Sequence, residues 1–330
     1  MHSLFVGPYR QTNTNGLASL SILHHLASKI QPNHSLACRN LYIDSVNVDR
    51  TNNLCSKFDQ LENSAAMPQT IIQHVPLHSI YVSNRIYNIC IPIIDNRGID
   101  IQHITRLATC NKIIADNAYS QEILSKLLPG YQIQHINYDP IVMDCKQKIN
   151  LGAYLYTKKL YFIGSYLDNI DLLQDLILSF IVSMSGKENI SLLLFLTDTN
   201  KKDIDNVNGY ISLVYKELSV TNVFPKVVCI DTKFDLAHIN NCHKIGDIYL
   251  NINDGSKNGL HINYARHHNK QIIDWSNLSF EFTNKRNNII NEQGFSVPLQ
   301  SSIMSAILQL ERLSTHSPSD IIPIERAIWE

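Results

Sequence analysis

The chain lacks the cysteine spacings that mark zinc sites and disulfide frameworks. Its seven cysteines are odd in number and scattered, and no two of them form a C-x-x-C pair. Structural zinc sites usually carry such pairs, and small secreted domains usually carry an even set of cysteines. We therefore expect reduced, mostly buried thiols and no metal site, and the three histidines His261, His267 and His268 do not change this, because no carboxylate or cysteine lies at ligand spacing beside them.

Long hydrophobic runs are also missing. The longest candidate, 172–184, is interrupted by Gln174 and Asp175, whereas a transmembrane helix needs about 20 mostly apolar residues. The N-terminal run 2–7 has no basic flank and no long apolar region, which disfavours a signal peptide. These patterns predict a cytoplasmic protein without a transmembrane segment.

Charge of one sign is not in excess. The chain has 28 basic and 29 acidic residues and a formal charge of −1, so its net charge encodes no general attraction to nucleic acid. A local basic groove remains open as an alternative. The 44% of hydrophobic residues and the 17% of charged residues are typical of a globular protein.

What is present is length and a regular alternation of strands and helices. A chain of 330 residues exceeds what one hydrophobic core usually supports, which predicts two domains. Short apolar runs alternate with helix-compatible segments, a pattern that favours mostly parallel sheets. The predicted strands are 2–7, 35–43, 70–74, 88–94, 112–115, 131–136, 160–164, 191–196, 226–230, 247–251 and 271–274.

The alternation breaks between residues 139 and 159, where Pro140, a charged stretch and Gly152 interrupt it. We place the domain boundary there, with a Rossmann-like first domain at 1–150 and a second one at 151–300. The segment 301–330 contains an amphipathic helix pattern at 301–313, and this helix is predicted to cross back to the first domain.

Several motifs carry a family resemblance when they are taken in order. Residues 7–11 (GPYRQ) and 15–19 (NGLAS) form a strand, a glycine-containing loop and the start of a helix, and 73–76 (QHVP) and 115–120 (ADNAYS) follow. In the second half, 159–166 (KLYFIGSY) is followed by 246–251 (GDIYLN) and 254–265 (DGSKNGLHINYA). Together they resemble the GT-B glycosyltransferases, in particular the retaining group 1 (family 4-like) branch and its members in large DNA viruses and phages.

The resemblance implies an α/β fold of the GT-B kind, in which two Rossmann-like parallel-sheet domains face a central cleft. It also implies transfer of a sugar from a nucleotide-sugar co-substrate to an acceptor hydroxyl, on a glycan or a modified DNA base. No other cofactor and no metal is strictly required. A viral member would work in the host cytoplasm, and homo- or hetero-oligomers are both open.

The chain departs from the family at the residues that hold the donor. Active relatives carry an Arg and a Lys shortly after the glycine that matches Gly164, but here those positions hold Ser165 or Tyr166 and Asp168 or Asn169. The two Glu of the family motif fall on Ser256 and Tyr264. Because neutral side chains bind sugar and ribose hydroxyls more weakly than carboxylates do, a catalytically inactive binding or scaffold subunit is the alternative function.

The resemblance assigns residues to each side of the expected cleft. His74, Arg10 and Lys257 are the catalytic candidates. The donor-binding candidates are Gly164, Ser165, Thr197, Asp231, Asp254, Gly255, Ser256, Lys257, Asn258, Gly259 and Tyr264. The acceptor-side candidates are Gly7, Arg10, Asn13, Asn15, Gly16, Asp95, Asn96 and Asn117.

Each candidate also has a structural interpretation. The glycines and asparagines of 7–16 suit a strand-to-helix turn and a helix cap, and Asp or Asn after a strand is an ordinary turn residue. His74 fits a histidine satisfied at a strand end, 254–259 fits a polar surface loop, and Tyr264 fits a helix core. In the functional alternative, the helix that starts near Gly259 points amide groups at a phosphate.

Overall fold

The computed structural model describes thirteen stretches of the chain. They are residues 1–11, 13–41, 58–62, 67–94, 100–145, 157–165, 170–184, 189–197, 199–218, 226–232, 235–251, 259–274 and 321–329. These residues form two compact units. The first comprises Met1–Ile141, Ser256–Asn263 and Pro318–Glu330, and the second comprises Val142–Gly255 and Tyr264–Ser317.

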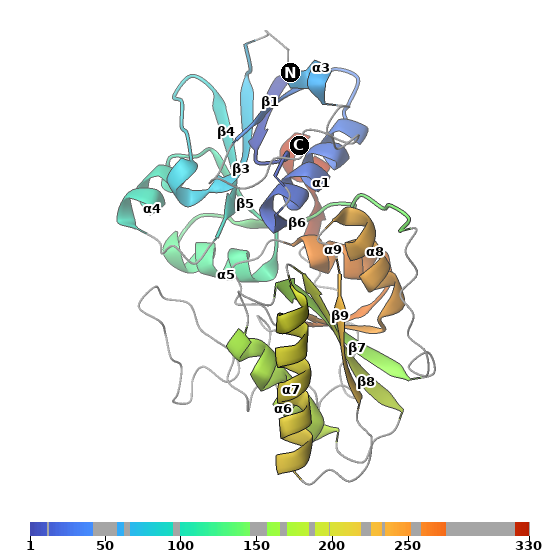
Figure 1. The fold of residues 1–330 in the computed structure, drawn as a ribbon. Helices are drawn as coiled ribbons and strands as arrows, with labels where there is room; N and C mark the ends of the chain where they lie inside the picture. Colours follow the sequence, from blue (N-terminus) through green and yellow to red (C-terminus); the bar gives the residue numbers. More distant parts are fainter. Residues whose placement is uncertain are drawn as a thin grey trace. The chain divides into compact units, whose positions relative to one another are not determined.

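The first unit is built on a seven-stranded sheet in which every described strand pair is parallel. In spatial order the strands are β12 (Ile321–Pro323), β6 (Gln134–Asn137), β5 (Lys112–Ala115), β4 (Tyr87–Ile93), β3 (Thr70–Pro76), β1 (His2–Gly7) and β2 (Ser35–Asn40). The helices are α1 (Thr14–Ser28), α3 (Asp59–Glu62), the short 3-10 helix η1 (Leu77–Ser79), α4 (Ile101–Ala108), α5 (Ala118–Leu127) and α12 (Ile324–Trp329). Figure 1 shows these elements.

The central strands of this sheet are covered on both faces. All seven residues of β3 are buried, and so are six of the seven in β4. A near-continuous apolar strand such as β4 is typical of a parallel sheet whose two faces carry helices. The strand β12 joins the edge of this sheet from the far end of the sequence, with Ile321 to Pro323 pairing with His135 to Asn137.

The second unit is built on a five-stranded sheet that is also parallel throughout its described strand pairs. Its strands, in spatial order, are β11 (Gln271–Asp274), β10 (Ile248–Asn251), β7 (Lys158–Ser165), β8 (Ile190–Thr197) and β9 (Lys226–Asp231). Its helices are α6 (Ile170–Ser183), α7 (Lys201–Glu217) and α8 (Leu236–Ile245). A further helix, α9 (Leu260–His267), is divided between the units: its first four residues belong to the first unit and its last four to the second.

Alternate side chains of β7 face two different layers of the second unit. Leu160 and Phe162 belong to a hydrophobic core that also includes residues of α6, β8 and α7. Tyr161, between them in sequence, contacts His243 of α8 instead. Because successive side chains of a strand point to opposite faces, this unit is a sheet with helices on both faces.

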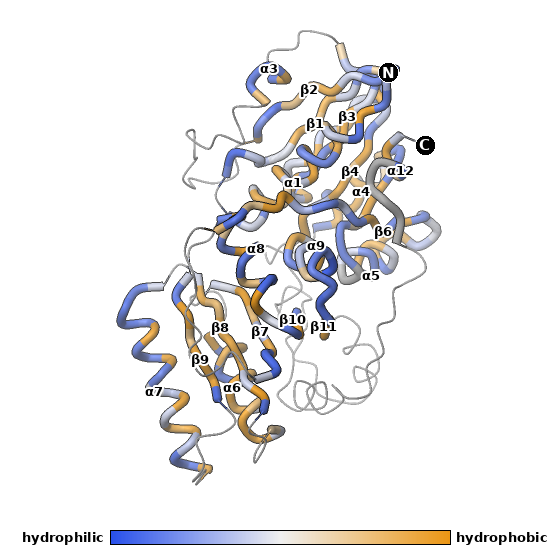
Figure 2. Tube along the Cα trace, turned by 90° about the vertical axis from the view of Figure 1, so that its right-hand side faces the viewer, coloured by the Kyte–Doolittle hydropathy of each residue, from blue (hydrophilic) through white to orange (hydrophobic). Residues whose placement is uncertain are grey.

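The hydropathy of the second unit follows this layering. In Figure 2 the strands β8 and β9 are mostly hydrophobic, while α7 alternates between hydrophilic and hydrophobic residues. Val207, Ile211 and Val214 form the buried stripe of α7. The helix begins at a capping box in which Asn200 and Asp203 satisfy each other's backbone amides at 3.1 and 3.0 Å.

The predicted fold class of two Rossmann-like parallel-sheet domains is therefore confirmed, and the cleft expected between them stays a prediction. The predicted domain bounds, 1–150 for the first domain and 151–300 for the second, also stay predictions. The helix expected at 301–313 lies outside the described residues. No helix among the described residues is long and apolar enough to cross a membrane.

Candidate functional site

Each sheet has one point where the strand order changes direction. In the first sheet the chain moves from β1 to β2 on one side and then returns to β3 on the other. In the second it moves from β7 through β8 to β9 and then returns to β10. Open α/β sheets bind ligands at the carboxyl ends of the strands beside such a point. The candidate sites are therefore the ends of β1 and β3 in the first unit and of β7 and β10 in the second.

Gly7 and His74 lie together at the switch point of the first sheet. Gly7 is the last residue of β1, and a Cβ atom at this position would lie 3.2 Å from the backbone oxygen of His74. This close approach of two strand ends explains the glycine, since a side chain here would crowd the neighbouring backbone. The two predicted candidates are thus brought together by the fold.

The His74 side chain is fully buried and is held by α1. Its Nδ1 atom lies 2.6 Å from the Ser19 hydroxyl, and its Nε2 atom has no hydrogen-bond partner in the described part of the chain. Burial lowers the pKa of His74 to about 3, so the imidazole is neutral at physiological pH. A general base works best with a pKa near the working pH, so this histidine is suited to hydrogen bonding rather than to proton abstraction.

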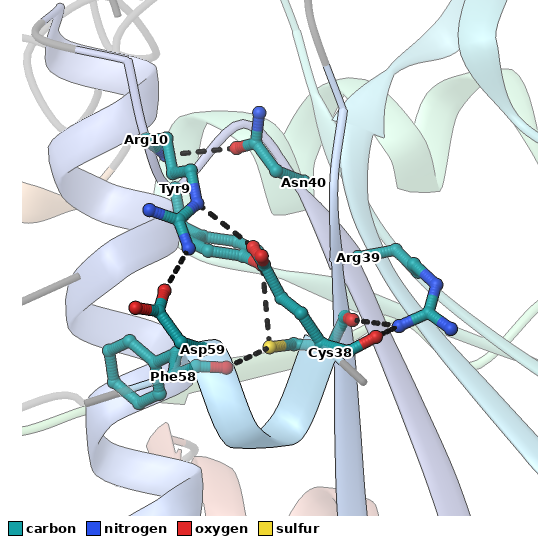
Figure 3. Close-up of polar contacts among 8 residues, drawn as sticks. Tyr9, Arg10, Cys38, Arg39, Asn40, Phe58 and Asp59 are labelled. Atoms are coloured by element: carbon teal, nitrogen blue, oxygen red, sulfur yellow. Dashed lines mark hydrogen bonds and ion pairs between the residues drawn. The ribbon is translucent and has the colours of Figure 1, made fainter. Parts of the chain in front are cut away.

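Arg10 follows the same strand, but its charge is already paired. Its guanidinium lies 2.6 Å from Asp59 and 2.9 Å from Glu62, both on α3, as Figure 3 shows for Asp59. The backbone amide of Arg10 donates to the side chain of Asn40 at 2.9 Å. Only 12% of the Arg10 side chain is exposed. These contacts hold α3 against the loop after β1, and the predicted contact of Arg10 with a sugar or acceptor stays a prediction.

The neighbouring Tyr9 belongs to the same polar cluster. Its hydroxyl, which has a single hydrogen to donate, lies within hydrogen-bond distance of the Glu62 carboxylate and, at 3.3 Å, of the Cys38 sulfur. Burial on its own raises the pKa of Glu62, but the hydrogen bonds from Arg10 and Tyr9 outweigh it, and the pKa of Glu62 is lowered. Glu62 is therefore ionised at neutral pH and balances the charge of Arg10.

The remaining candidates of the first loop shape the backbone. Asn13 caps α1, since its side-chain oxygen accepts from the Gly16 amide at 2.8 Å. A Cβ atom on Gly16 would lie 2.1 Å from the backbone oxygen of Gln11, so only glycine fits there. Asn15 lies in the first turn of α1 and is half-buried. Asn13 and Gly16 thus have the turn and capping roles that were the structural alternative.

Asn117 has a capping role as well, and Asp116 beside it contacts Gly259. The Asn117 side chain caps α5 by accepting from the Ser120 amide at 2.7 Å. The Asp116 carboxylate accepts from the Asn117 side chain at 3.0 Å and from the Gly259 amide at 2.9 Å. The amide of Gly259, expected to face a phosphate, therefore faces a carboxylate of the protein itself.

At the switch point of the second sheet, Gly164 and Ser165 end β7 and Asn251 ends β10. On the neighbouring strands, the Thr197 hydroxyl is buried and has no hydrogen-bond partner among the described residues. Asp231 at the end of β9 accepts from the Thr199 hydroxyl at 2.6 Å. The predicted donor-side residues of these strands thus lie at the carboxyl edge of the sheet.

The side chain of Tyr264 is not exposed to a ligand in the structure. It is fully buried, and its ring stacks on His243 with centroids 5.7 Å apart and an angle of 11° between the planes. His243 in turn lies 2.8 Å, through Nδ1, from the Tyr161 hydroxyl. Tyr264 thus lies in the aromatic core of the second unit, and its expected donor contact stays a prediction.

Some predicted residues lie outside the described part of the chain, and their roles stay predictions. They are Asp95 and Asn96 on the acceptor side, and Asp254, Gly255, Ser256, Lys257 and Asn258 in the expected donor loop. Among the residues that the structure describes, no group of three or more His, Cys, Asp or Glu could hold a metal ion.

Sequence reasoning did not find three of the partners described above. They are Ser19 for His74, Glu62 for Arg10, and Gly259 for Asp116. Ser19 was recognisable only as a small polar residue within the apolar stretch of α1. Glu62 and Gly259 lie far from their partners in sequence, 52 and 143 residues away. No local pattern reports such a pairing.

No protein-family model matches the chain, and no curated protein matches it either. Solved structures with a similar fold include TarM of S. aureus in a complex with UDP, with 12% identity, a TM-score of 0.42, and coverage of 74% of this chain and 48% of TarM. The UDP-GlcNAc 2-epimerase of Neisseria meningitidis has 11% identity and a TM-score of 0.46, covering 94% of this chain and 92% of its own.

The trehalose-6-phosphate synthase OtsA has 9% identity and a TM-score of 0.48, covering 95% of this chain and 92% of its own. The chain thus spans about half of TarM and most of the other two.

Proposed function

We propose that the chain is a nucleotide-sugar-dependent glycosyltransferase of the GT-B kind. The observation that supports this most is the presence of two separate doubly wound parallel sheets, each with its own switch point and with polar residues at the strand ends beside it. A single sheet of this type provides one ligand crevice. Two of them suit a reaction that brings together a nucleotide sugar and an acceptor hydroxyl of a glycan or a modified DNA base.

The second sheet is assigned to the nucleotide sugar. Thr197 offers a buried hydroxyl without a described partner, and Gly164 and Ser165 end the strand beside the switch point. Lys257, which lies outside the described residues, is the residue that the family resemblance assigns to the diphosphate, and in this proposal it supplies the positive charge. Because sugar transfer asks little covalent chemistry of the protein, orientation of the substrates and stabilisation of the departing diphosphate would supply most of the rate.

The first sheet is assigned to the transferred sugar or the acceptor. The neutral His74 imidazole, held by Ser19, keeps Nε2 for a hydroxyl group. Because the pKa of His74 is low, this side chain is better suited to orient that hydroxyl group by a hydrogen bond than to act as a general base.

A panel of nucleoside diphosphates and nucleotide sugars tests the proposal. A ligand that binds only the folded protein raises the protein's free energy of unfolding by about 2.7 kcal/mol when the ligand concentration is 100 times the Kd. A thermal-shift assay detects a stabilisation of this size. We expect a shift with at least one nucleoside diphosphate and its sugar, followed by release of that diphosphate when an acceptor is added. No shift with any member of the panel would sink the proposal.

Thr197→Val sharpens this test. Valine has nearly the shape of threonine but no hydroxyl, and the hydroxyl has no described partner inside the protein, so stability should stay unchanged or rise. Nucleotide affinity should fall by about tenfold, the value of one lost hydrogen bond of about 1.4 kcal/mol. Ser3→Ala removes another buried, unpaired hydroxyl, from β1, and should leave affinity unchanged.

A second function, nucleotide or sugar binding without catalysis, has its own supporting observations. The Arg10 charge is balanced by Asp59 and Glu62, and Tyr264, which aligns with a family Glu, lies in the core. A binding subunit would shift in the thermal assay but would release no diphosphate with any acceptor. Turnover measured on the same protein sample therefore separates the two functions.

A further inference from the structure

The start of α9 is capped by a residue from a distant part of the first unit. Gly259 directly precedes the helix, and its amide donates to the Asp116 carboxylate at 2.9 Å. The starts of α1, α5 and α7 are each capped by the residue that precedes the helix, which is Asn13, Asn117 and Asn200 respectively. The cap of α9 instead comes from the end of β5, 143 residues earlier.

The capping group carries a negative charge. Burial raises the pKa of Asp116 to about 6, and hydrogen bonds from Gly259 and Ser120 act against that rise, so the group is ionised at neutral pH. A helix N-terminus attracts anions because its first amides are unpaired and the helix dipole is positive there. Asp116 therefore occupies the position that an anionic ligand would take.

A second donor lies beside Gly259 and is not used. The Asn263 side chain is 3% exposed, and its Nδ2 atom has no hydrogen-bond partner among the described residues. This atom lies 3.3 Å from the place that a Cβ atom on Gly259 would occupy, and the backbone oxygen of Asp116 lies 2.2 Å from the same place. A buried amide donor without an acceptor is costly, and a native protein usually keeps one for a reason. Two buried donors therefore lie side by side, the Gly259 amide and the Asn263 Nδ2 atom, and Asp116 accepts a hydrogen bond only from the first.

We propose that Asp116 is an internal competitor for an anion site formed by the Gly259 amide and the Asn263 side chain, so that a phosphate group binds there only by displacing the Asp116 carboxylate. We take the phosphate group to be part of a nucleotide diphosphate, and this choice of ligand rests on the proposed function. In the described structure the site is closed by the protein's own anion. Ligand affinity is reduced by the fraction of molecules in which Asp116 holds the site.

The test measures the Kd of UDP and of inorganic pyrophosphate by calorimetry for the full chain and three variants. Asp116→Asn keeps an oxygen that can accept from Gly259 but removes the charge, so both Kd values should fall by about tenfold if Asp116 leaves the site open in about one molecule in ten. Asn263→Ala removes the second donor and should raise both values. Asp100→Asn removes a carboxylate that caps α4 in the same unit and should change neither.

The outcomes separate this inference from the proposed function. An unchanged Kd in Asp116→Asn, or an equal gain in Asp100→Asn, would overturn the competitor role while leaving the glycosyltransferase proposal in place. Tighter pyrophosphate binding by Asp116→Asn, without binding of any nucleotide by any variant, would support the competitor and overturn the proposed function. Binding of neither probe to any variant would overturn both. If Asp116→Asn does not fold, weaker binding by Asn263→Ala supports the anion site, and an unchanged Kd there rejects it.

Discussion

The Nε atom of Arg10 lies 2.9 Å from the carboxylate of Glu62, although the two residues are 52 positions apart. This ion pair ties the short helix α3 to the loop that follows β1. The sequence places Arg10 in a loop that is expected to contact a ligand, but in the structure its charge is paired with Asp59 and Glu62. Its first measurable effect should therefore be on stability.

A double-mutant cycle with Arg10→Ala and Glu62→Ala should give a coupling of about 1 to 3 kcal/mol in urea unfolding at neutral pH, since the pair is partly buried. The pKa of Glu62 is lowered in the folded state, so this stabilisation is present above the ordinary pKa of a glutamate and is lost as the pH falls through the folded value. The exposed pair Glu122–Lys126 is the control, and its coupling should be about 0.3 to 0.5 kcal/mol. Equal coupling in both pairs would contradict the structural role.

Ser19 and Ser21 provide a matched pair on α1. Ser19→Ala deprives the buried His74 of its Nδ1 partner and should lower the free energy of unfolding by about 1 to 3 kcal/mol. Ser21 is equally buried, but its hydroxyl has no described partner, so Ser21→Ala should change stability by less than about 1 kcal/mol. Urea titrations of both variants check this, and losses of the same size would argue against the Ser19–His74 contact.

Two glycines of the second unit should respond to alanine in opposite directions. A Cβ atom on Gly246 would lie 2.0 Å from the ring of the buried Tyr161, so Gly246→Ala should cost about 1 to 3 kcal/mol or more through overpacking. Apart from its chain neighbours and the backbone of its own helix, Gly209 in the middle of α7 has no atom within 4 Å of its Cβ position. Gly209→Ala should therefore stabilise the protein by about 0.5 to 1 kcal/mol. Thermal or urea unfolding measures both, and a stable Gly246→Ala would refute the packing around Tyr161.

Asp116 should make stability depend on pH. Its pKa is raised in the folded state, so the folded protein holds the proton more tightly than the unfolded chain does, and stability is lost as the pH rises through the folded value of about 6. Relative to Asp116→Asn, the wild type should lose at most about 3 kcal/mol between about pH 4 and pH 7. The measurement is the difference in unfolding free energy between the two proteins across this range. A constant difference would show that Asp116 titrates normally.

Much of the fold followed from the sequence. The strand predicted at 112–115 coincides with β5, and the one at 271–274 coincides with β11. Runs such as 191–196 are apolar on both faces, which a strand in a covered parallel sheet requires, and β8 spans Ile190–Thr197. The helix α4 was missed, because it is short and only Leu107 among its residues is buried. The strand β12 was missed because its three residues carry too little pattern to be recognised.

The sequence by itself determined the order of strands and helices and the two parallel sheets, because these depend on local apolar patterns and on turn residues between them. It also located candidate residues such as Gly7, His74 and Thr197 at strand ends. Only the tertiary structure decided which of their groups are already used: Arg10 by Glu62, His74 by Ser19, and the Gly259 amide by Asp116. These partners lie 52, 55 and 143 residues apart, and such contacts form only when packing of the whole unit brings distant segments together.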